Sequence, residues 1–251
     1  MHAEWQQTLN QPLVTADDVH VWRIGLEVGD TLLARLRDIL SDDEQQRADR
    51  FHFEKDRRHF TSARAAMRIL LAGYLARRPQ EVRFAYSNYG KPRLADANNG
   101  GDLRFNLTHS HGLALLAVTR RREIGVDVER LRDMERDGES LAQRFFSPRE
   151  LAVLLSLPQD QRREAFFHCW TRKEAYIKAH GEGLSLPLEQ FDVSLHPDEP
   201  AALLATQHDP QEVRRWSLQA LFPGEGYVGA LVVEGHSWRL WCGDWVAQAT
   251  D

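Results

Sequence analysis

Two carboxylates lie two residues apart in the segment IGVDVE, residues 124–129. Alternate residues of a β-strand share a face, so Asp127 and Glu129 would point together, away from the apolar side chains between them. Neighbouring carboxylates repel each other unless a cation lies between them. Oxygen-only ligands favour Mg²⁺ or Mn²⁺, bound together with phosphate oxygens and water. Gly125 has no side chain and would leave room for a bulky ligand beside the metal. A strand whose acidic face meets only water is an equally good interpretation of this segment.

A second set of reactive side chains lies in the segment WTRKEAYIK, residues 170–178. Trp170, Glu174 and Lys178 are spaced four residues apart and would project along one stripe of a helix. Glu174 is a candidate third metal ligand or general base, and Lys178 is a candidate partner for a phosphate oxygen. Taken alone, this helix is better explained by a Glu–Lys surface pair, which contributes only about 0.3–0.5 kcal/mol.

Hydroxyl and imidazole groups are concentrated in the segment NLTHSHG, residues 106–112. Thr108, His109 and Ser110 are suited to holding a phosphate group, although a polar turn closed by its own hydrogen bonds gives the same pattern. His109 and His111 suggest a zinc site, but no cysteine or further histidine lies at ligand spacing nearby. Ser110 is not part of a Gly-x-Ser-x-Gly motif, so the sequence predicts no catalytic triad.

The charge of the chain is distributed unevenly. Residues 47–93 hold twelve Lys and Arg against four Asp and Glu, a net charge of +8, whereas the whole chain has a net charge of −5. A basic segment in an acidic protein suggests a local site for an anion such as a phosphorylated small molecule. On charge counting alone, an ordinary solvated Arg-rich helix is the more common explanation.

Hydrophobic periodicity supplies the elements that must position these side chains. Apolar residues at helical spacing predict a long helix over residues 57–78, ended by Pro79. A second long helix is predicted over residues 162–179. Ser41 with Glu44, and Ser147 before Pro148, have the pattern of helix N-caps. The remaining segments predict strands and a shorter helix, which together give an α+β pattern of two similar halves. The predicted strands cover residues 19–26, 113–119, 123–129, 191–195, 215–220, 227–233 and 237–245, and the shorter helix covers residues 148–155.

Composition excludes several classes of protein. The chain has 251 residues, of which 42% are hydrophobic and 27% are charged, values typical of a globular protein. No run of 18 apolar residues is present, and the first ten residues lack the pattern of a signal peptide, so we expect no membrane partner. The two cysteines form no CxxC pair, and we therefore expect a cytoplasmic protein. The net charge is not that of a general nucleic-acid-binding protein.

Taken jointly, these segments resemble the 4′-phosphopantetheinyl transferase superfamily, in particular its larger, surfactin-synthetase-activating (Sfp-like) type. The resemblance runs from about residue 47 to residue 195. Two departures are Thr108, where serine is usual, and His111, where a small residue is usual. The shared elements, in family order, are an Arg-rich helix (residues 50–68), Gly90-Lys91-Pro92, residues 106–110, residues 125–129, Phe145-Phe146-Ser147 with Glu150, residues 170–178, and residues 183–187.

The resemblance implies an enzyme that transfers the 4′-phosphopantetheine arm of coenzyme A to a serine of an apo acyl or peptidyl carrier protein and releases adenosine 3′,5′-bisphosphate. Asp127, Glu129 and Glu174 would hold Mg²⁺, with Mn²⁺ as an alternative. The base that deprotonates the serine would be Glu174 or a metal-bound hydroxide. Lys178 would pair with the diphosphate. The remaining contacts to coenzyme A would come from His109, Arg50 and Arg64 at the 3′-phosphate, from the Thr108 hydroxyl, and from Gly90, Lys91 and Pro92 beside the adenine and ribose.

The resemblance also implies a fold: a pseudo-symmetric α+β monomer of two similar lobes, each a long helix packed on a small antiparallel sheet. We expect a cationic, coenzyme A-binding N-terminal lobe over residues 15–122 and a Mg²⁺- and carrier-binding C-terminal lobe over residues 123–248. Basic residues in the segment 130–163 would dock acidic carrier proteins; they are Arg144, Arg149, Arg162 and Arg163.

Two other functions remain open at this point. One is a non-catalytic protein that binds an anionic ligand or nucleic acid through residues 47–93. The sequence has no helix-turn-helix and no platform of aromatic and basic residues, so nucleic acid is not the expected partner. The other is a Mg²⁺-dependent diphosphate hydrolase that uses the same carboxylates.

Overall fold

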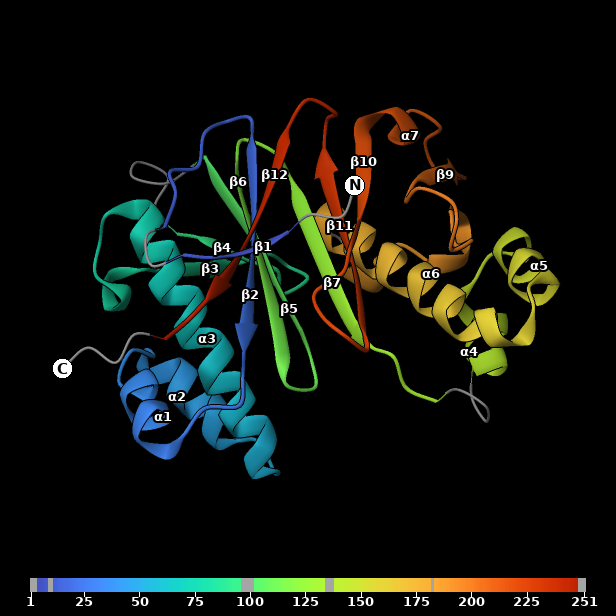
Figure 1. The fold of residues 1–251 in the computed structure, drawn as a ribbon. Coiled ribbons are helices and arrows are strands. Elements are labelled where there is room, and N and C mark those ends of the chain that lie inside the picture. The colour runs from blue at the N-terminus through green and yellow to red at the C-terminus, as the bar shows by residue number, and fades with distance from the viewer. Residues whose placement is uncertain (1–3, 9–10, 96–101, 134–137, 182, 248–251) are drawn as a thin grey trace.

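The computed structural model describes residues 4–8, 11–95, 102–133, 138–181 and 183–247. Two β-sheets lie in the middle of the molecule, and a long helix covers the outer face of each (Figure 1). The helices are α1 (Asp30–Arg37), α2 (Asp42–Asp49), α3 (Glu54–Leu75), α4 (Gly138–Phe145), α5 (Pro148–Ser156), α6 (Gln159–His180) and α7 (Glu212–Arg215). Short 3₁₀ turns follow at Pro79–Glu81, Gly183–Ser185 and Leu188–Gln190.

The first sheet has five strands in the order β1 (Trp5–Gln7), β12 (Arg239–Trp245), β2 (Asp18–Gly25), β6 (Leu113–Arg120) and β5 (Leu103–Ser110). The second has three strands in the order β10 (Trp216–Leu221), β11 (Tyr227–Glu234) and β7 (Ile124–Arg130). Two hairpins complete the described chain, β3 (Phe84–Tyr86) with β4 (Pro92–Leu94) and β8 (Phe191–Val193) with β9 (Leu203–Thr206).

The predicted α+β class is confirmed, but one feature of the prediction is wrong. The five-stranded sheet is mixed rather than antiparallel, because β12 pairs in parallel with both β1 and β2. This strand lies inside the predicted C-terminal lobe, residues 123–248, yet it belongs to the sheet of the N-terminal half. Strand pairing therefore crosses the predicted boundary at residues 122 and 123. Residues 96–101, 134–137, 182 and 248, which the predicted limits include, lie outside the described residues.

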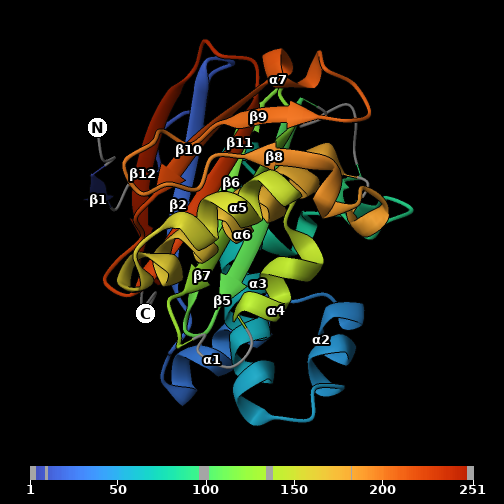
Figure 2. The ribbon, with the colours of Figure 1, turned by 90° about the vertical axis from the view of Figure 1, so that its right-hand side faces the viewer.

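Three apolar layers hold these elements together. Residues of α3, among them Met67 and Leu71, pack against one face of the five-stranded sheet. The other face of this sheet packs against the three-stranded sheet through residues such as Val21, Leu115 and Val126. A third layer lies between the three-stranded sheet and α6, which crosses in front of the strands in the side view (Figure 2). Strands with both faces covered in this way are largely apolar, as β6 is.

The two long helices each have 22 residues, and their ends differ slightly from the prediction. Helix α3 ends at Ala76, which has a left-handed φ of 50°, three residues before Pro79. Helix α6 ends at Gly181, whose φ of 85° is easily adopted only by glycine. The cap at Ser147 is confirmed, since its hydroxyl accepts a hydrogen bond from the Glu150 amide at 3.2 Å. No described helix is both long and apolar enough to cross a membrane.

Candidate functional site

The two sheets meet where their edge strands, β5 and β7, lie side by side. The two strands belong to different sheets, and side chains of β5 bind the backbone of β7. The Asn106 Oδ1 accepts a hydrogen bond from the Val126 amide at 2.8 Å, and the Ser110 hydroxyl accepts one from the Arg130 amide at 3.2 Å. The polar face of β5 is thereby placed against the acidic face of β7. A junction between two sheet edges thus brings two of the sequence-predicted segments together.

Helix α6 approaches β7 closely at Gly125. A Cβ atom added at this glycine would overlap the Ala175 carbonyl oxygen and the Ala179 amide nitrogen, both in the backbone of α6. The prediction that Gly125 leaves room for a bulky ligand is therefore wrong: the space is filled by the helix. The close approach has a consequence for the site, because it holds Glu174 and Lys178 of α6 against the carboxylates of β7.

Asp127 lies at the centre of the contacts between β5, β7 and α6. Its Oδ1 is 2.6 Å from the Lys178 ammonium and accepts a hydrogen bond from the Thr108 hydroxyl at 3.0 Å. Lys178 also donates to Thr108 at 3.3 Å. The Asp127 Oδ2 is buried and has no hydrogen-bond partner among the described residues. A buried carboxylate oxygen without a partner is costly, and it is the kind of atom that a cation satisfies.

Glu129 and Glu174 complete a carboxylate cluster with Asp127. Burial and the Asp127 charge raise the pKa of Glu129, although its Oε2 accepts a 2.7 Å hydrogen bond from the Ser110 hydroxyl. Burial also raises the pKa of Glu174, and the charges of Asp127 and Glu129 add to the effect against the opposing influence of Lys178. The three carboxylates are therefore close enough to affect one another. Among the described residues, however, no choice of one carboxylate oxygen from each of the three brings all three oxygens within 4.8 Å of one another.

Lys178 remains charged in this setting. Burial lowers its pKa, but the negative charges of Asp127, Glu174 and Glu129 outweigh burial, and the net shift is upward. The predicted metal ligands and the predicted phosphate partner are thus gathered in one place. In this structure Lys178 pairs with Asp127.

His109 lies on the opposite face of β5 from Thr108 and Ser110, and it is exposed. Desolvation of the imidazole by the neighbouring elements lowers its pKa, and the charges of Lys178 and His59 lower it further. His59 belongs to α3 and Lys178 to α6, so His109 is close enough to both helices for their charges to act on it. Nothing in the sequence distinguishes His59 from the other residues of the Arg-rich helix. His111 occupies the tight turn between β5 and β6 with a φ of 54°, which accounts for its position in the motif.

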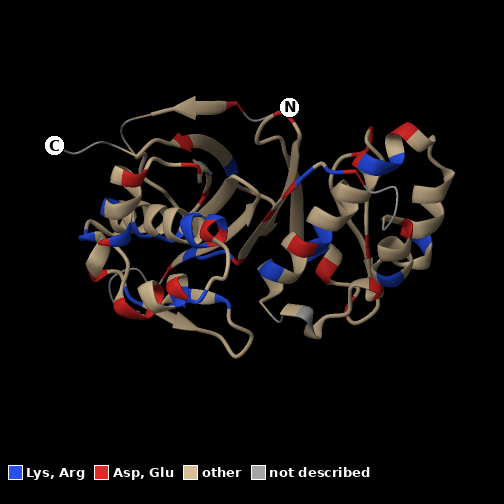
Figure 3. Ribbon diagram, turned by 90° about the horizontal axis from the view of Figure 1, so that it is seen from below, with Lys and Arg blue, Asp and Glu red and all other residues tan. Residues whose placement is uncertain are grey.

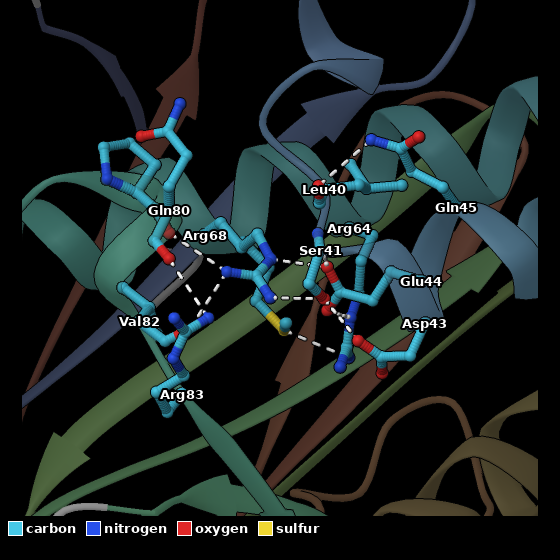
Figure 4. A network of polar contacts seen from close by, with 12 residues as sticks. Leu40, Ser41, Asp43, Glu44, Gln45, Arg64, Arg68, Gln80, Val82 and Arg83 are labelled. Atoms are coloured by element: carbon cyan, nitrogen blue, oxygen red, sulfur yellow. Dashed lines mark hydrogen bonds and ion pairs between the residues drawn. The ribbon is translucent and has the colours of Figure 1, made fainter.

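Arg64, predicted at the 3′-phosphate, is bound within the protein. Its Nε lies 2.5 Å from the Glu44 Oε1, and its Nη2 donates to the Tyr86 hydroxyl. Arg68 contacts the other carboxylate oxygen of Glu44 at 2.5 Å and also donates to the Ser41 hydroxyl (Figure 4). We call Glu44, Arg64 and Arg68 the Glu44 network. Although burial opposes it, the two guanidinium groups lower the pKa of Glu44.

The Glu44 network borders a small cavity of about 250 Å³, which is also lined by Asp43, Arg47, Phe60 and Tyr86. Arg50, the other arginine predicted at the 3′-phosphate, follows α2 directly and is exposed. The structure therefore separates the two arginines: one is buried in an ion pair and the other faces solvent. A phosphate-binding role for either stays a prediction.

Gly90, Lys91 and Pro92 form the turn and the start of the second strand in the β3–β4 hairpin. Gly90 has a φ of 80°, which the turn requires. The Lys91 ammonium donates to the carbonyl oxygens of Ile124 and Ala179, both at 3.2 Å, and thus binds the C-terminal end of α6, where the helix dipole favours a cation. Burial lowers the pKa of Lys91. Lys91 and Pro92 line a cavity of about 550 Å³ that reaches Arg104 and His180.

Comparison with known proteins identifies the relatives of this chain. Residues 123–232 match the 4′-phosphopantetheinyl transferase superfamily, and residues 30–121 match the family described as 4′-phosphopantetheinyl transferase, N-terminal. The 4′-phosphopantetheinyl transferase HetI of Nostoc sp. (strain PCC 7120) is 46% identical over 89% of this chain and 91% of its own length.

Two more distant relatives extend this comparison. The 4′-phosphopantetheinyl transferase Sfp of Bacillus subtilis (strain 168) is 29% identical over 73% of this chain and 80% of its own length. Among solved structures, the holo-[acyl-carrier-protein] synthase of Thermotoga maritima matches 47% of this chain and 64% of its own, with 25% identity and a TM-score of 0.35. The resemblance inferred from the sequence is confirmed by the family matches and the two curated relatives.

Proposed function

Because this chain belongs to the 4′-phosphopantetheinyl transferase superfamily, we propose that it transfers the 4′-phosphopantetheine moiety of coenzyme A to a serine of an apo acyl or peptidyl carrier protein. The second product is adenosine 3′,5′-bisphosphate. The observation that carries the proposal is the carboxylate cluster beside Lys178, at the junction of β5, β7 and α6. Such a site combines oxygen ligands for a divalent cation with a donor for phosphate oxygens.

Asp127, Glu129 and Glu174 are the residues that would hold Mg²⁺, with Mn²⁺ as an alternative. Their fit to a hard divalent cation is supported by the unpartnered Asp127 Oδ2 and by the raised pKa values of the two glutamates. When bound, such an ion neutralises phosphate oxygens and the charge that develops on the leaving group.

The remaining groups bind and orient the substrates. Lys178, still charged, and the Thr108 hydroxyl present donors to the diphosphate. Glu174 is the candidate base for the carrier serine, since a raised pKa makes a carboxylate a better proton acceptor near neutral pH. Gly90, Lys91 and Pro92 offer the adenine and ribose a surface beside the cavity of about 550 Å³.

The 3′-phosphate is assigned to His109 with Arg50 and Arg64. Because Arg64 also holds Glu44, the variants that isolate the phosphate contact are His109→Gln and Arg50→Gln. Loss of a hydrogen bond to a charged group costs about 1.5–3 kcal/mol, so each should raise the KM for coenzyme A roughly tenfold or more. The measurement is a set of initial rates at varied coenzyme A. An unchanged KM in both variants would show that the 3′-phosphate binds elsewhere.

The carrier protein would dock on the C-terminal half, residues 123–248, whereas residues 15–122 supply the cationic side of the site. Arg162 and Arg163 border a cavity of about 540 Å³ together with Leu155 and Phe166. Asp133, Glu139 and Asp160 also line this cavity, so its charge is mixed rather than basic. Acidic and basic residues are likewise interspersed on the helices of both halves (Figure 3), a pattern that does not favour nucleic acid as the partner. The enzyme acts as a cytoplasmic monomer in this proposal, which light scattering after gel filtration tests directly.

The transfer itself is tested by incubating the protein with coenzyme A, Mg²⁺ and a purified apo carrier protein, followed by intact-mass measurement. The expected result is a carrier heavier by one phosphopantetheine group, with no gain on a carrier whose acceptor serine is replaced by alanine. A matched reaction without any carrier separates transfer from hydrolysis. Coenzyme A cleaved equally fast in that reaction, with no modified carrier in the first, would refute the transferase and favour a diphosphate hydrolase.

A further inference from the structure

A second group of possible ligands lies outside the carboxylate cluster. His180 is the last residue of α6, His208 lies in the turn after β9, and Glu212 is the first residue of α7. One ligand atom from each lies within 4.8 Å of the other two. The His180 Nε2 is 3.7 Å from the Glu212 Oε2, and the rings of the two histidines are nearly perpendicular with centroids 6.0 Å apart. The end of α6 and the segment from residue 208 to residue 212 therefore place two imidazoles and one carboxylate around a common point.

The spacing and the donor types suit a borderline transition-metal cation. Zinc binds imidazole nitrogen and carboxylate oxygen at about 2.0–2.2 Å in a tetrahedron, which puts neighbouring ligand atoms about 3.4 Å apart. The observed 3.7 Å between the His180 Nε2 and the Glu212 Oε2 is close to that value. Mg²⁺ prefers oxygen ligands and an octahedral arrangement, so this group of donors selects against the ion expected at the carboxylate cluster.

Glu212 is held in place by its own hydrogen bonds. The carboxylate is buried, and its Oε2 accepts hydrogen bonds from the Trp216 indole at 2.6 Å and from the Tyr176 hydroxyl at 3.2 Å. Arg215 donates to its Oε1 at 3.1 Å. Burial raises the pKa of Glu212, but these hydrogen bonds outweigh it, so the carboxylate stays ionised. Outer hydrogen bonds of this kind orient ligands in metal sites and fix them before the ion arrives.

The two sites lie on different sides of α6. Successive helical residues are about 100° apart, so Tyr176 and His180 project about 200° away from Glu174 and Lys178. The exposed His208 gives solvent access to the new group, and three protein ligands leave a fourth position for water.

We propose that His180, His208 and Glu212 form a site for a transition-metal cation of the Zn²⁺ type. Bound metal would connect the end of α6 to the β9–α7 turn and so stabilise the helix that carries Glu174 and Lys178. This site does not depend on the proposed transfer reaction.

The test is equilibrium dialysis of the full chain against Zn²⁺, with Mg²⁺ in large excess to occupy the carboxylate cluster. The wild type should bind one Zn²⁺. His208→Ala should weaken binding by at least about 100-fold, more than the 10–100-fold typical of losing an outer hydrogen-bond partner. His208 is exposed, so this variant should fold normally, which circular dichroism can verify. His180→Ala provides a second variant with the same expected loss.

Two controls locate the ion. His196→Ala removes a histidine of the same half that contacts only Asp198 among the ion pairs of the described residues, and it should leave Zn²⁺ binding unchanged. Asp127→Asn changes the carboxylate cluster and should also leave it unchanged. Co²⁺ in place of Zn²⁺ should give the intense visible absorption of a four-coordinate site with nitrogen ligands. The proposal is overturned if the wild type binds no Zn²⁺, or if His208→Ala and His180→Ala bind it as tightly as the wild type.

Discussion

Two buried groups of charged residues, one beside each long helix, differ in how their charges are balanced. In the Glu44 network a single carboxylate lies between two guanidinium groups, and its pKa is lowered in spite of burial. In the carboxylate cluster three acidic groups share the ammonium of Lys178, and the pKa values of Glu129 and Glu174 are raised. The first group is satisfied by the protein itself. The second, when ionised, lacks two positive charges, which is the charge of one divalent cation. A buried charge that is paired within the protein therefore indicates a structural role, and a buried charge that lacks a partner indicates a binding site.

The largest expected effect of a single change is at the centre of the carboxylate cluster. Asp127→Asn keeps the shape of the side chain but removes the charge beside Lys178, and we expect transfer to fall by about 10²–10³-fold, as for other groups that stabilise transition-state charge. The measurement is the rate of carrier modification, with circular dichroism to verify the fold. Asp192→Asn on strand β8 is the matched control and should keep wild-type activity. Near-normal turnover by Asp127→Asn would contradict the metal assignment.

The corresponding change in the Glu44 network should act on stability instead. Glu44→Gln leaves two buried guanidinium groups without a counter-charge, and breaking a buried ion pair in this way costs about 3–5 kcal/mol. Urea unfolding measures the difference. Glu129→Gln is the contrasting variant, because it relieves repulsion between carboxylates and should unfold at the same or a higher urea concentration while losing activity. If both variants destabilise the protein equally, the distinction between the two groups fails.

A smaller effect is expected where helix α6 contacts β7. Gly125→Ala would push against the α6 backbone, and overpacking of a core typically costs about 1–3 kcal/mol. Because the same contact positions Glu174 and Lys178, transfer should slow as well. Gly25→Ala, at an exposed glycine with open space around the added methyl group, is the matched control. Wild-type stability of Gly125→Ala would mean that the two elements can separate without cost.

The smallest effect, a dependence of stability on pH, should have opposite signs in the two groups. The folded-state pKa of Glu44 is lowered, so its contribution is fully present above the ordinary value of 4.5 and is lost as the pH falls through the folded-state pKa. The pKa values of Glu129 and Glu174 are raised, so the folded state takes up their protons first and gains stability as the pH falls through those raised values.

Urea unfolding of the wild type, Glu44→Gln and Glu129→Gln between pH 3 and 7 tests these signs. In acid, the free energy of unfolding of the wild type should no longer exceed that of Glu44→Gln. Likewise, the free energy of unfolding of Glu129→Gln should no longer exceed that of the wild type. A difference that does not change with pH in either comparison would contradict the assigned pKa directions.

Local patterns were enough to predict how several side chains of the candidate site are arranged, although their functional roles stay predictions. The two-residue spacing of Asp127 and Glu129 placed them on one strand face, and the four-residue spacing of Glu174 and Lys178 placed them on one helical stripe. Both arrangements are present in the structure. Periodicity also located α3 to within three residues at each end, since an apolar face is a property of the sequence itself. The ends of α6 were predicted equally well, although its buried residues are spread around the helix rather than gathered on one face.

Features that depend on contacts between distant segments could not be predicted in the same way. The pattern around Gly125 says that a side chain is absent but not what fills the space. Arg64 resembles other arginines of its helix until Glu44, 20 residues earlier, is placed against it. The group of His180, His208 and Glu212 likewise exists only after the end of α6 has folded against residues 208–212. Tertiary pairing of this kind leaves no regular spacing in the chain.

The insertion of β12 between β1 and β2 has a consequence for the order in which the protein assembles. Residues 18–25 are synthesised more than 200 positions before their parallel partner, residues 239–245, so the first half emerges from the ribosome with one edge of its sheet unpaired. An exposed edge is prone to pair with other chains. We therefore expect nascent or truncated chains that end before Arg239 to aggregate or bind chaperones, and pulse proteolysis of stalled chains would detect the late closure of this sheet.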